Sequence, residues 1–333
     1  MSEIAFKPPA PIEPTILGLS RLPSIVQSTG ERGIRRILEF FAAHVRNPNT
    51  RHAYARACLR FFDWADKKGI GHLSAVEPAI VAAYVEGLQR DLAAPSVKQH
   101  LAAIRMLFDW LVIGQVMPHN VAASVRGPKH VVRQGKTPIL STEQTRALLD
   151  SLPLRKKDGS PDLAGLRDRA LIGTMVFAFA RVGAVTRMRT SDYYPNGKRF
   201  WVRLHEKGGK RHQLPAHHKL EQFLDEYLAA TGICAERDSP LFRKLLPDKT
   251  LSTAPLHRND VLRMVKRRVL AAGLPLSTCS HSFRATGITS YLENGGTLEH
   301  AQAIACHESP RTTKLYDRTG DRITLEEIER IRI

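Results

Sequence analysis

Several signatures of cofactor-dependent and secreted proteins are missing from this sequence. Its four cysteines are Cys58, Cys234, Cys279 and Cys306. They lie far apart and form no Cys-x-x-Cys pair, which argues against a zinc site and against a disulfide framework. A Walker-type phosphate loop and a set of paired carboxylates for a metal are also missing. We therefore expect neither a metal nor a nucleotide cofactor.

Long hydrophobic segments are missing as well. The longest apolar run covers residues 170–180, which is too short to cross a bilayer as a helix. The N-terminus lacks the charged and then apolar pattern of a secretory signal peptide. Together with the scattered cysteines, these observations predict a reduced, cytoplasmic protein without a membrane partner.

Negative charge is in short supply. The 333 residues include 50 Lys plus Arg but 32 Asp plus Glu, a formal net charge of +18, and the pI is about 10.1. The excess is spread over both halves of the chain, and such a basic surface favours a polyanionic partner. A merely soluble basic surface is the alternative when charge is considered alone. Hydrophobic residues make up 43% of the chain, enough for the cores of two domains.

The distribution of Pro, Gly and hydrophobic residues divides the chain into four parts. Residues 1–18 are a proline-containing tail that is not expected to fold alone. Residues 19–125 are expected to form a helical domain. Residues 126–140 are rich in Gly, Pro and basic residues, which predicts a linker close to a phosphate backbone. Residues 141–333 are expected to form the second domain.

In the first domain, hydrophobic residues recur at intervals of three and four, as they do on one face of a helix. Asn49 and Thr50 are candidate caps for one helix, and Ser96 is a candidate cap for another. With the apolar segments near residues 22–45 and 75–92, the pattern predicts a helical bundle.

The second domain is expected to be mainly helical, with a small antiparallel sheet over about residues 188–215. Residues 141–144, Ser-Thr-Glu-Gln, match a capping box that would begin its first helix. The Asn-Gly pair at residues 196–197 is typical of a hairpin turn. A second turn, with two glycines, separates the strand-like residues 200–204 from residues 211–214.

A further capping box lies near the C-terminal end, at residues 324–327. Leu325, Ile328 and Ile331 would form a narrow apolar stripe on the helix that follows. We expect this tail helix to bury its stripe either on its own domain or on a neighbouring protomer.

The most informative residues are His281, Arg284, His307 and Tyr316, in the last sixth of the chain. A guanidinium can hold two oxygens of a phosphodiester at once. Imidazoles can donate hydrogen bonds to the same oxygens or transfer protons near neutral pH. A tyrosine hydroxyl becomes a nucleophile when its proton is accepted or its anion is stabilised. The set therefore predicts phosphoryl transfer onto Tyr316.

Upstream residues complete this set. Arg181 follows the apolar residues 170–180, which we expect to be a buried helix that presents the guanidinium at its end. Lys207 lies on the glycine turn between the two expected strands, and Lys210 lies on the same turn, so either ammonium could supply a proton. A single His-x-x-Arg pattern is most often a solvated helix face, and other tyrosines are better explained by core packing. The prediction rests on the joint pattern.

The order of these residues resembles the tyrosine recombinase family, also called phage integrases. The residues that carry the resemblance are, in order, Arg181, Lys207, His281, Arg284, His307 and Tyr316. The resemblance spans roughly residues 20–320. It implies that the two arginines clamp the scissile phosphate, that Lys207 rather than Lys210 protonates the leaving 5′ oxygen, and that His281 assists proton transfer. The second histidine would hydrogen-bond the phosphate, and Tyr316 would attack it to form a 3′-phosphotyrosyl intermediate.

Two places differ from the common pattern of the family. Ala184 stands three residues after Arg181, where the family usually has an acidic residue that orients the site, so the support of this arginine is left open. Ala305 and Cys306 replace the usual Leu-Gly before His307. We expect altered packing there, without loss of chemistry.

The resemblance implies a mainly α fold with a small antiparallel sheet, in which an N-terminal helical core-binding domain and a C-terminal catalytic domain hold opposite faces of DNA. The implied function is a site-specific recombinase or integrase of a mobile element, which cuts and rejoins double-stranded DNA without metal or ATP. A homotetramer would act on two duplexes, with accessory DNA-bending proteins as further partners. Two other classes share part of the pattern: a DNA-relaxing enzyme like the type IB topoisomerases, and a catalytically weak DNA-binding accessory protein.

Overall fold

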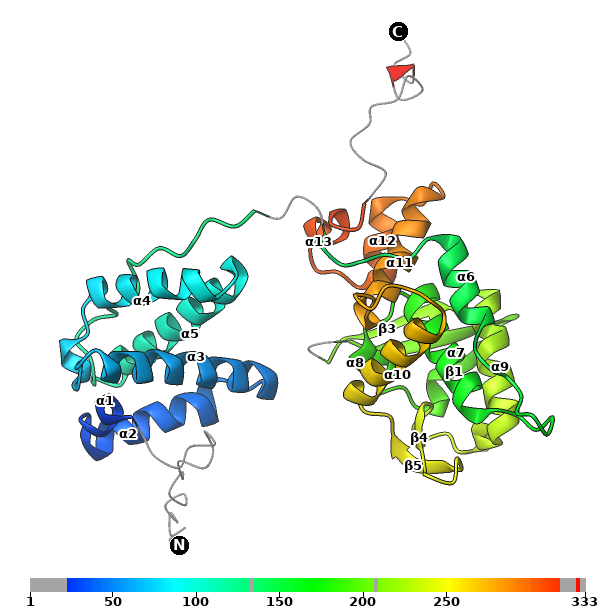
Figure 1. Ribbon diagram of the computed structural model, residues 1–333, viewed down its shortest axis with the longest axis horizontal. Helices are drawn as coiled ribbons and strands as arrows, with labels where there is room; N and C mark the ends of the chain where they lie inside the picture. The colour runs from blue at the N-terminus through cyan, green and yellow to red at the C-terminus, as the bar shows by residue number, and fades with distance from the viewer. Residues whose placement is uncertain (1–22, 132–134, 207–208, 318–327, 330–333) are drawn as a thin grey trace, which may run out of the picture. The chain divides into compact units, whose positions relative to one another are not determined.

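In this computed structural model, the described residues are 23–131, 135–206, 209–317 and 328–329. The chain divides into two compact units, Met1–Val131 and Val132–Ile333 (Figure 1). Each has a hydrophobic core of its own. Within the described ranges, no helix combines the length and the hydrophobicity needed to cross a membrane.

The N-terminal unit is a helical bundle, as its hydrophobic periodicity predicted. Its elements are α1 (Ser24–Gln27), α2 (Gly30–Glu39), the π-helical turn η2 (Phe40–His44), α3 (Pro48–Lys67), the 3₁₀ turn η3 (Leu73–Ala75), α4 (Pro78–Asp91) and α5 (Ala94–Ile113). Helix α5 packs against α2, α3 and α4. Aromatic rings fill the core between them, where Phe61 makes edge-to-face contacts with Tyr84 and Phe108.

Two helices of this unit begin earlier than the sequence pattern predicted. The cap of α3 is Asn47, whose side-chain oxygen accepts hydrogen bonds from the backbone N–H groups of Asn49 and Thr50 at 3.0 and 3.2 Å. Ser96 already lies inside the first turn of α5. Each helix has a proline in its first turn, where the ring fixes φ in the helical range and the missing N–H is not needed. The caps predicted from the sequence were wrong for this reason.

The C-terminal unit is mainly helical and contains two small sheets. Its helices are α6 (Thr142–Asp150), α7 (Leu163–Phe177), α8 (Val182–Val185), α9 (His218–Thr231), α10 (Arg258–Ala271), α11 (Ser280–Glu293), α12 (Leu298–Ala305) and α13 (Pro310–Lys314), with 3₁₀ turns η4 (Thr190–Asp192) and η6 (Ile233–Ala235). The predicted capping box begins α6: Ser141 Oγ accepts from the Gln144 N–H at 3.1 Å, and the Gln144 side chain accepts from the Ser141 N–H at 3.0 Å.

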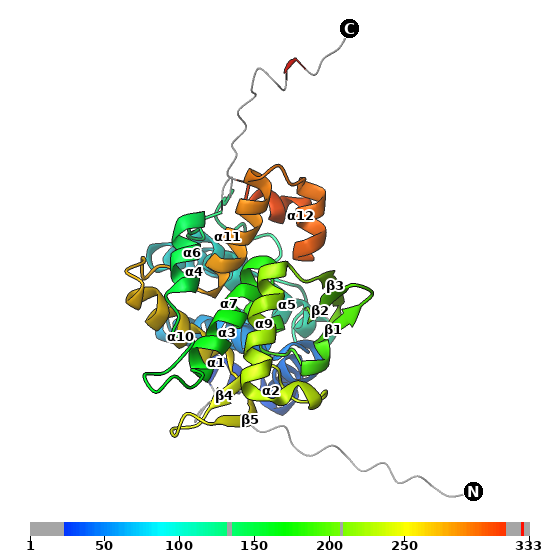
Figure 2. The same cartoon turned by 90° about the vertical axis from the view of Figure 1, so that its right-hand side faces the viewer.

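Helix α7 is the centre of this unit and is buried on all sides. Residues 165–176 are all buried, because α9 and α11 pack against the helix. Figure 2 shows α7 and α9 side by side. A buried carboxylate, Asp168, bonds to the guanidinium groups of Arg167 and Arg268 at 2.7 and 2.8 Å. This paired charge ties α7 to α10.

The buried helix ends before it reaches the predicted catalytic arginine. Helix α7 stops at Phe177, and Phe179 has φ of +48°, in the left-handed region that terminates helices. Arg181 is the residue before α8. The apolar run is buried as expected, but the prediction that Arg181 lies at the end of this helix was wrong.

The larger sheet is an antiparallel meander of β1 (Tyr193–Asn196), β2 (Arg199–His205) and β3 (Arg211–Pro215). The Asn-Gly pair forms the first turn as predicted, with Gly197 at φ of +62°. Residues 207–208, in the second turn, lie outside the described residues. The smaller sheet pairs β4 (Arg243–Leu245) with β5 (Leu251–Pro255) and was not predicted.

A glycine lets α7 and α11 approach closely. A Cβ atom added at Gly287 would lie 2.0 Å from the backbone oxygen of Val176 and 2.9 Å from the ring of Phe179. Helix α11 also carries His281 and Arg284. The close approach therefore lets Arg284 reach the segment after α7, where its guanidinium donates to the Phe179 carbonyl.

Gly287→Ala is expected to destabilise the C-terminal unit by about 1–3 kcal/mol, because the new methyl group meets a backbone oxygen and α7 must shift. Equilibrium denaturation followed by circular dichroism measures the effect. Gly87→Ala is the matched control, since Gly87 lies in α4 and an added Cβ would have nothing within 4 Å. That control should be neutral or stabilising by up to about 1 kcal/mol. Wild-type stability of Gly287→Ala would contradict the prediction.

Candidate active site

Tyr316 lies shortly after α13 and directs its hydroxyl at the start of α11. The hydroxyl is hydrogen-bonded to Nε2 of His281 at 2.8 Å. The ring stacks on His307, with 5.7 Å between centroids and 9° between planes. The backbone is held at both polar groups: its N–H donates to the Thr313 carbonyl at 2.9 Å, and its carbonyl accepts from the Thr289 hydroxyl at 2.8 Å. These contacts hold the buried phenol in one orientation.

Arg284 lies one turn after His281 and is almost fully buried, with 1% of its surface exposed. Its guanidinium donates to the carbonyl oxygens of Phe179 and Ala305. It therefore joins the segment after α7 to the end of α12. Among the described residues, the buried Nε of Arg284 has no hydrogen-bond partner. A guanidinium has five N–H donors, so donors remain for an anion.

Arg181, before α8, forms an ion pair with Glu206, which follows β2. The Nη1 to Oε2 distance is 2.5 Å. The carboxylate is 4% exposed and the arginine side chain 37% exposed. Ala184 is buried in α8 and has no polar side-chain group. The carboxylate beside Arg181 therefore comes from the residue after β2 and not from α8.

His307 follows α12 through a strained residue. Cys306 has φ of 48° and ψ of 49°, a left-handed conformation that costs a non-glycine residue about 1–2 kcal/mol. The left-handed conformation is one that the usual glycine of the family would adopt without this cost; the altered packing expected here stays a prediction. The imidazole of His307 still stacks on Tyr316, and its Nδ1 is 2.9 Å from the hydroxyl of Thr313.

Burial and two nearby guanidinium groups shift the pKa values of the site. Burial, followed by the charges of Arg284 and Arg181, lowers the pKa of His281 below its usual value and that of His307 to about 3. Burial raises the pKa of Tyr316, and the two arginines oppose this rise. Burial also lowers the pKa of Arg284 to about 10. At neutral pH the site thus holds two neutral imidazoles, a neutral phenol and two cations.

The predicted proton donor cannot be placed, because Lys207 lies outside the described residues. Lys210 is described and forms an exposed ion pair with Glu308 at 2.8 Å. This hydrogen bond raises the pKa of Lys210 above its usual value, which makes its ammonium a weaker acid. The predicted tail helix at residues 324–331 also lies outside the described residues, except for residues 328–329.

Glu206 was not among the predicted site residues, although strand periodicity contains a signal for it. Val202 and Leu204 point inward from β2 with 0% and 1% exposure. Alternation along the strand places residue 206 on the same inward face. A carboxylate on an inward face must find a cation or hydrogen-bond donors, and here it finds Arg181.

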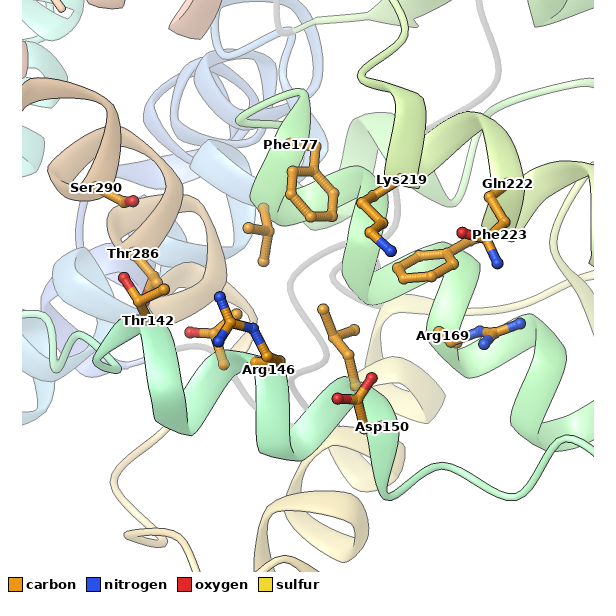
Figure 3. Close-up of a pocket in the computed structure, with 13 residues that line it drawn as sticks. Thr142, Arg146, Asp150, Arg169, Phe177, Lys219, Gln222, Phe223, Thr286 and Ser290 are labelled. Atoms are coloured by element: carbon orange, nitrogen blue, oxygen red, sulfur yellow. The ribbon is translucent and has the colours of Figure 1, made fainter. Parts of the chain in front are cut away.

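A separate cavity of 380 Å³ lies between α6, α7, α9 and α11. Arg146 and Lys219 extend toward it from α6 and α9, while Thr286 and Ser290 line it from α11 (Figure 3). None of the described predicted site residues lines this cavity. One face of α11 thus faces the cavity and another face carries His281 and Arg284. In the described ranges, no three His, Cys, Asp or Glu side chains are grouped to hold a metal ion.

Both units match families of known proteins. Residues 139–322 match the phage integrase family, and residues 38–114 match the phage integrase N-terminal SAM-like domain. The tyrosine recombinase XerD of Bifidobacterium longum is 25% identical over 88% of this chain and 96% of its own length. The tyrosine recombinase XerC of Pelobacter propionicus is 27% identical over 81% of this chain and 84% of its own length.

Solved structures share the fold. The XerH site-specific recombinase bound to palindromic difH substrate has a TM-score of 0.69 at 16% identity, covering 94% of this chain and 98% of that chain. A lambda integrase dimer bound to a COC′ core site has a TM-score of 0.64 at 19% identity, covering 87% and 79%. These likenesses confirm the predicted fold, which is mainly helical with small antiparallel sheets. With a family match over more than half of its length, the chain belongs to the tyrosine recombinase, or phage integrase, family and is a site-specific recombinase.

Proposed function

We propose that this recombinase cleaves and rejoins double-stranded DNA at specific sites through a 3′-phosphotyrosyl intermediate, without metal or ATP. The observation that carries the proposal is the hydrogen bond of 2.8 Å between the Tyr316 hydroxyl and His281 Nε2. The hydroxyl thereby has a proton acceptor, and two guanidinium groups supply the positive charge that a phosphodiester requires.

In the proposed reaction, the Tyr316 oxygen attacks the scissile phosphorus while its proton passes to the neutral imidazole of His281. The bond from phosphorus to the 5′ oxygen breaks, and Lys207 gives that oxygen a proton. Arg181 and Arg284 hold the non-bridging oxygens. The new phosphotyrosyl ester keeps the energy of the broken diester, so a 5′-hydroxyl of a partner strand can reverse the step without ATP.

His307 would serve as a hydrogen-bond donor to the phosphate. Because its pKa is about 3, its imidazole carries one proton across the working pH range. The Thr313 hydroxyl lies at Nδ1, and when it donates there the ring proton is on Nε2. That proton is then available to a phosphate oxygen, next to the ring of Tyr316.

The proposed partner is duplex DNA, which both units would hold. We assign DNA binding to the helical residues 19–125 and to the basic linker of residues 126–140, and catalysis to residues 141–333. A lambda integrase has been solved as a tetramer bound to a Holliday junction, which supports a homotetramer on two duplexes here. Accessory DNA-bending proteins and a cytoplasmic site of action belong to the same proposal.

The pH dependence of cleavage should report His281. A general base works in its neutral form, and a pKa lowered from about 6.5 keeps the imidazole neutral to a lower pH. We expect the second-order rate constant for cleavage, which reports the free enzyme, to fall on the acid side with a midpoint below the usual histidine pKa of about 6.5. This acid limb should disappear in His281→Gln. A midpoint above the usual histidine pKa would contradict this assignment.

Lys207→Ala should slow cleavage on the order of 10²- to 10⁴-fold, because the leaving 5′ oxygen then lacks a proton donor. A substrate with a bridging 5′ sulfur has a better leaving group and should restore most of the rate. Single-turnover cleavage of both substrates measures this. Lys210→Ala is the matched control from the same turn and should keep its rate on the oxygen substrate. If the 5′-thio substrate restored the rate of Lys210→Ala and not that of Lys207→Ala, Lys210 would be the proton donor.

The decisive test is to trap a covalent complex. Wild-type protein is incubated, in buffer with EDTA, with nicked suicide duplexes taken from DNA that flanks the coding sequence, and the products are separated on a denaturing gel. A 3′-linked adduct at Tyr316 is the expected product. A two-site assay then separates recombination from the relaxing activity of a type IB topoisomerase-like enzyme. If the protein bound these duplexes specifically and formed no adduct, the proposed cleavage would be wrong and an accessory DNA-binding protein would be favoured.

A further inference from the structure

Glu206 is a buried acidic residue that the reaction described above does not use. It follows Val202 and Leu204 on the inward face of β2, and its carboxylate is 4% exposed. Its backbone N–H donates to the Lys210 carbonyl at 2.8 Å, which closes the turn that carries Lys207. In the sequence, the residue thus lies between β2 and the proposed proton donor.

The carboxylate of Glu206 is directed at the phosphate-binding arginines. Its Oε2 accepts a hydrogen bond from Arg181 Nη1 at 2.5 Å, and its negative charge also favours the charged form of the buried Arg284. A buried charge without a partner is strongly unfavourable. In the absence of DNA the carboxylate therefore stabilises both guanidinium groups, whose like charges repel each other.

Arg181 needs such a contact more than Arg284 does. Arg284 is almost fully buried and is held by the carbonyl groups of Phe179 and Ala305. Arg181 has 37% of its side chain exposed, and a long exposed side chain loses considerable rotamer freedom when it is fixed. A single Nη1 contact orients the guanidinium and leaves its other N–H donors for phosphate.

We propose that Glu206 is a positioning residue for cleavage, which holds Arg181 in the orientation that receives the scissile phosphate. The inference rests on the proposed function, because it concerns the same phosphate clamp. The family usually has an acidic residue at the position of Ala184 in α8. Here the carboxylate that contacts Arg181 belongs to Glu206, the residue after β2. Glu206 touches no reacting atom and acts through Arg181.

The test is single-turnover cleavage of the suicide duplex at saturating protein, with duplex affinity and melting temperature measured separately. Glu206→Gln keeps the size of the side chain but removes the charge of the hydrogen bond. We expect cleavage to slow on the order of 10- to 100-fold, with affinity nearly unchanged. Glu226→Gln is the matched control, because Glu226 also pairs with an arginine, Arg169 of α7, which lines the separate cavity and not the proposed site. It should cleave like wild type.

Two further measurements separate positioning of Arg181 from a merely structural effect. In a double-mutant cycle, Glu206→Gln should cost much less in an Arg181→Lys background than in wild type, because both changes remove the same oriented guanidinium. The bridging 5′-thio substrate should not rescue Glu206→Gln, since its defect lies in the clamp and not in the leaving group.

The outcomes are distinct from those that test the proposed function. If wild type forms no adduct, the proposed function fails. If wild type forms the adduct and Glu206→Gln cleaves at the same rate, only the role of Glu206 is overturned. Additive losses in the double-mutant cycle would also overturn the role of Glu206, since the residue would then act through the fold. Rescue by the 5′-thio substrate would overturn it too, since Glu206 would then act through Lys207.

Discussion

Tyr316→Phe is expected to form no covalent adduct with a suicide duplex while binding that duplex almost as tightly as wild type. The substitution removes the oxygen that would bond to phosphorus, so attachment should fall below detection at any reaction time. The phenyl ring keeps its stacking on His307. Most of the buried surface therefore stays unchanged, and the loss of one hydrogen bond to His281 should alter stability by about 1 kcal/mol.

The measurement is a denaturing gel of the trapped complex beside a titration of duplex binding. Tyr291→Phe is the matched control, because Tyr291 packs against the same small apolar cluster as Tyr316 and its ring contacts Phe179. It should form the adduct at the wild-type rate. An adduct formed by Tyr316→Phe would assign the nucleophile to a different residue. An adduct missing from both variants and from wild type would instead point to binding without catalysis.

Hydrophobic periodicity was sufficient to predict the class of fold, because helix faces and strand alternation are local properties. The exact start and end of individual helices depended on single residues that the periodicity does not include. A proline in the first turn moved the starts of α3 and α5, and the left-handed Phe179 separated α7 from Arg181. The strands β4 and β5 escaped prediction because Arg-Lys-Leu and Leu-Ser-Thr-Ala-Pro show no alternation of apolar and polar residues.

The candidate site could be predicted from sequence only as a set of residues. Order and spacing indicated which side chains belong together, and the structure brings His281, His307 and Tyr316 into contact. Their supports could not be predicted in this way. Arg284 donates to a carbonyl 105 residues away, and Glu206 reaches Arg181 across 25 residues. Such pairings depend on how α7, α11 and the sheet pack, and no local pattern encodes that packing.

Arg284→Lys is the second substitution expected to have a very large effect. The Arg284 guanidinium bonds to the carbonyl groups of Phe179 and Ala305 and still has donors for a phosphate. An ammonium has three donors on one atom and cannot reproduce that planar arrangement. Cleavage should fall on the order of 10²- to 10³-fold, the usual cost of removing one donor that stabilises a transition state.

Part of any loss could come from the fold, because a buried carbonyl left without a donor costs about 1–3 kcal/mol. Arg243→Lys is the matched control: Arg243 is also buried and donates to a carbonyl and to Glu236, but it lies in β4. Both variants should melt at lower temperature, and only Arg284→Lys should lose cleavage per folded molecule. If Arg284→Lys cleaves at the wild-type rate, the guanidinium only joins the segment after α7 to the end of α12, and the phosphate must be held by other cations.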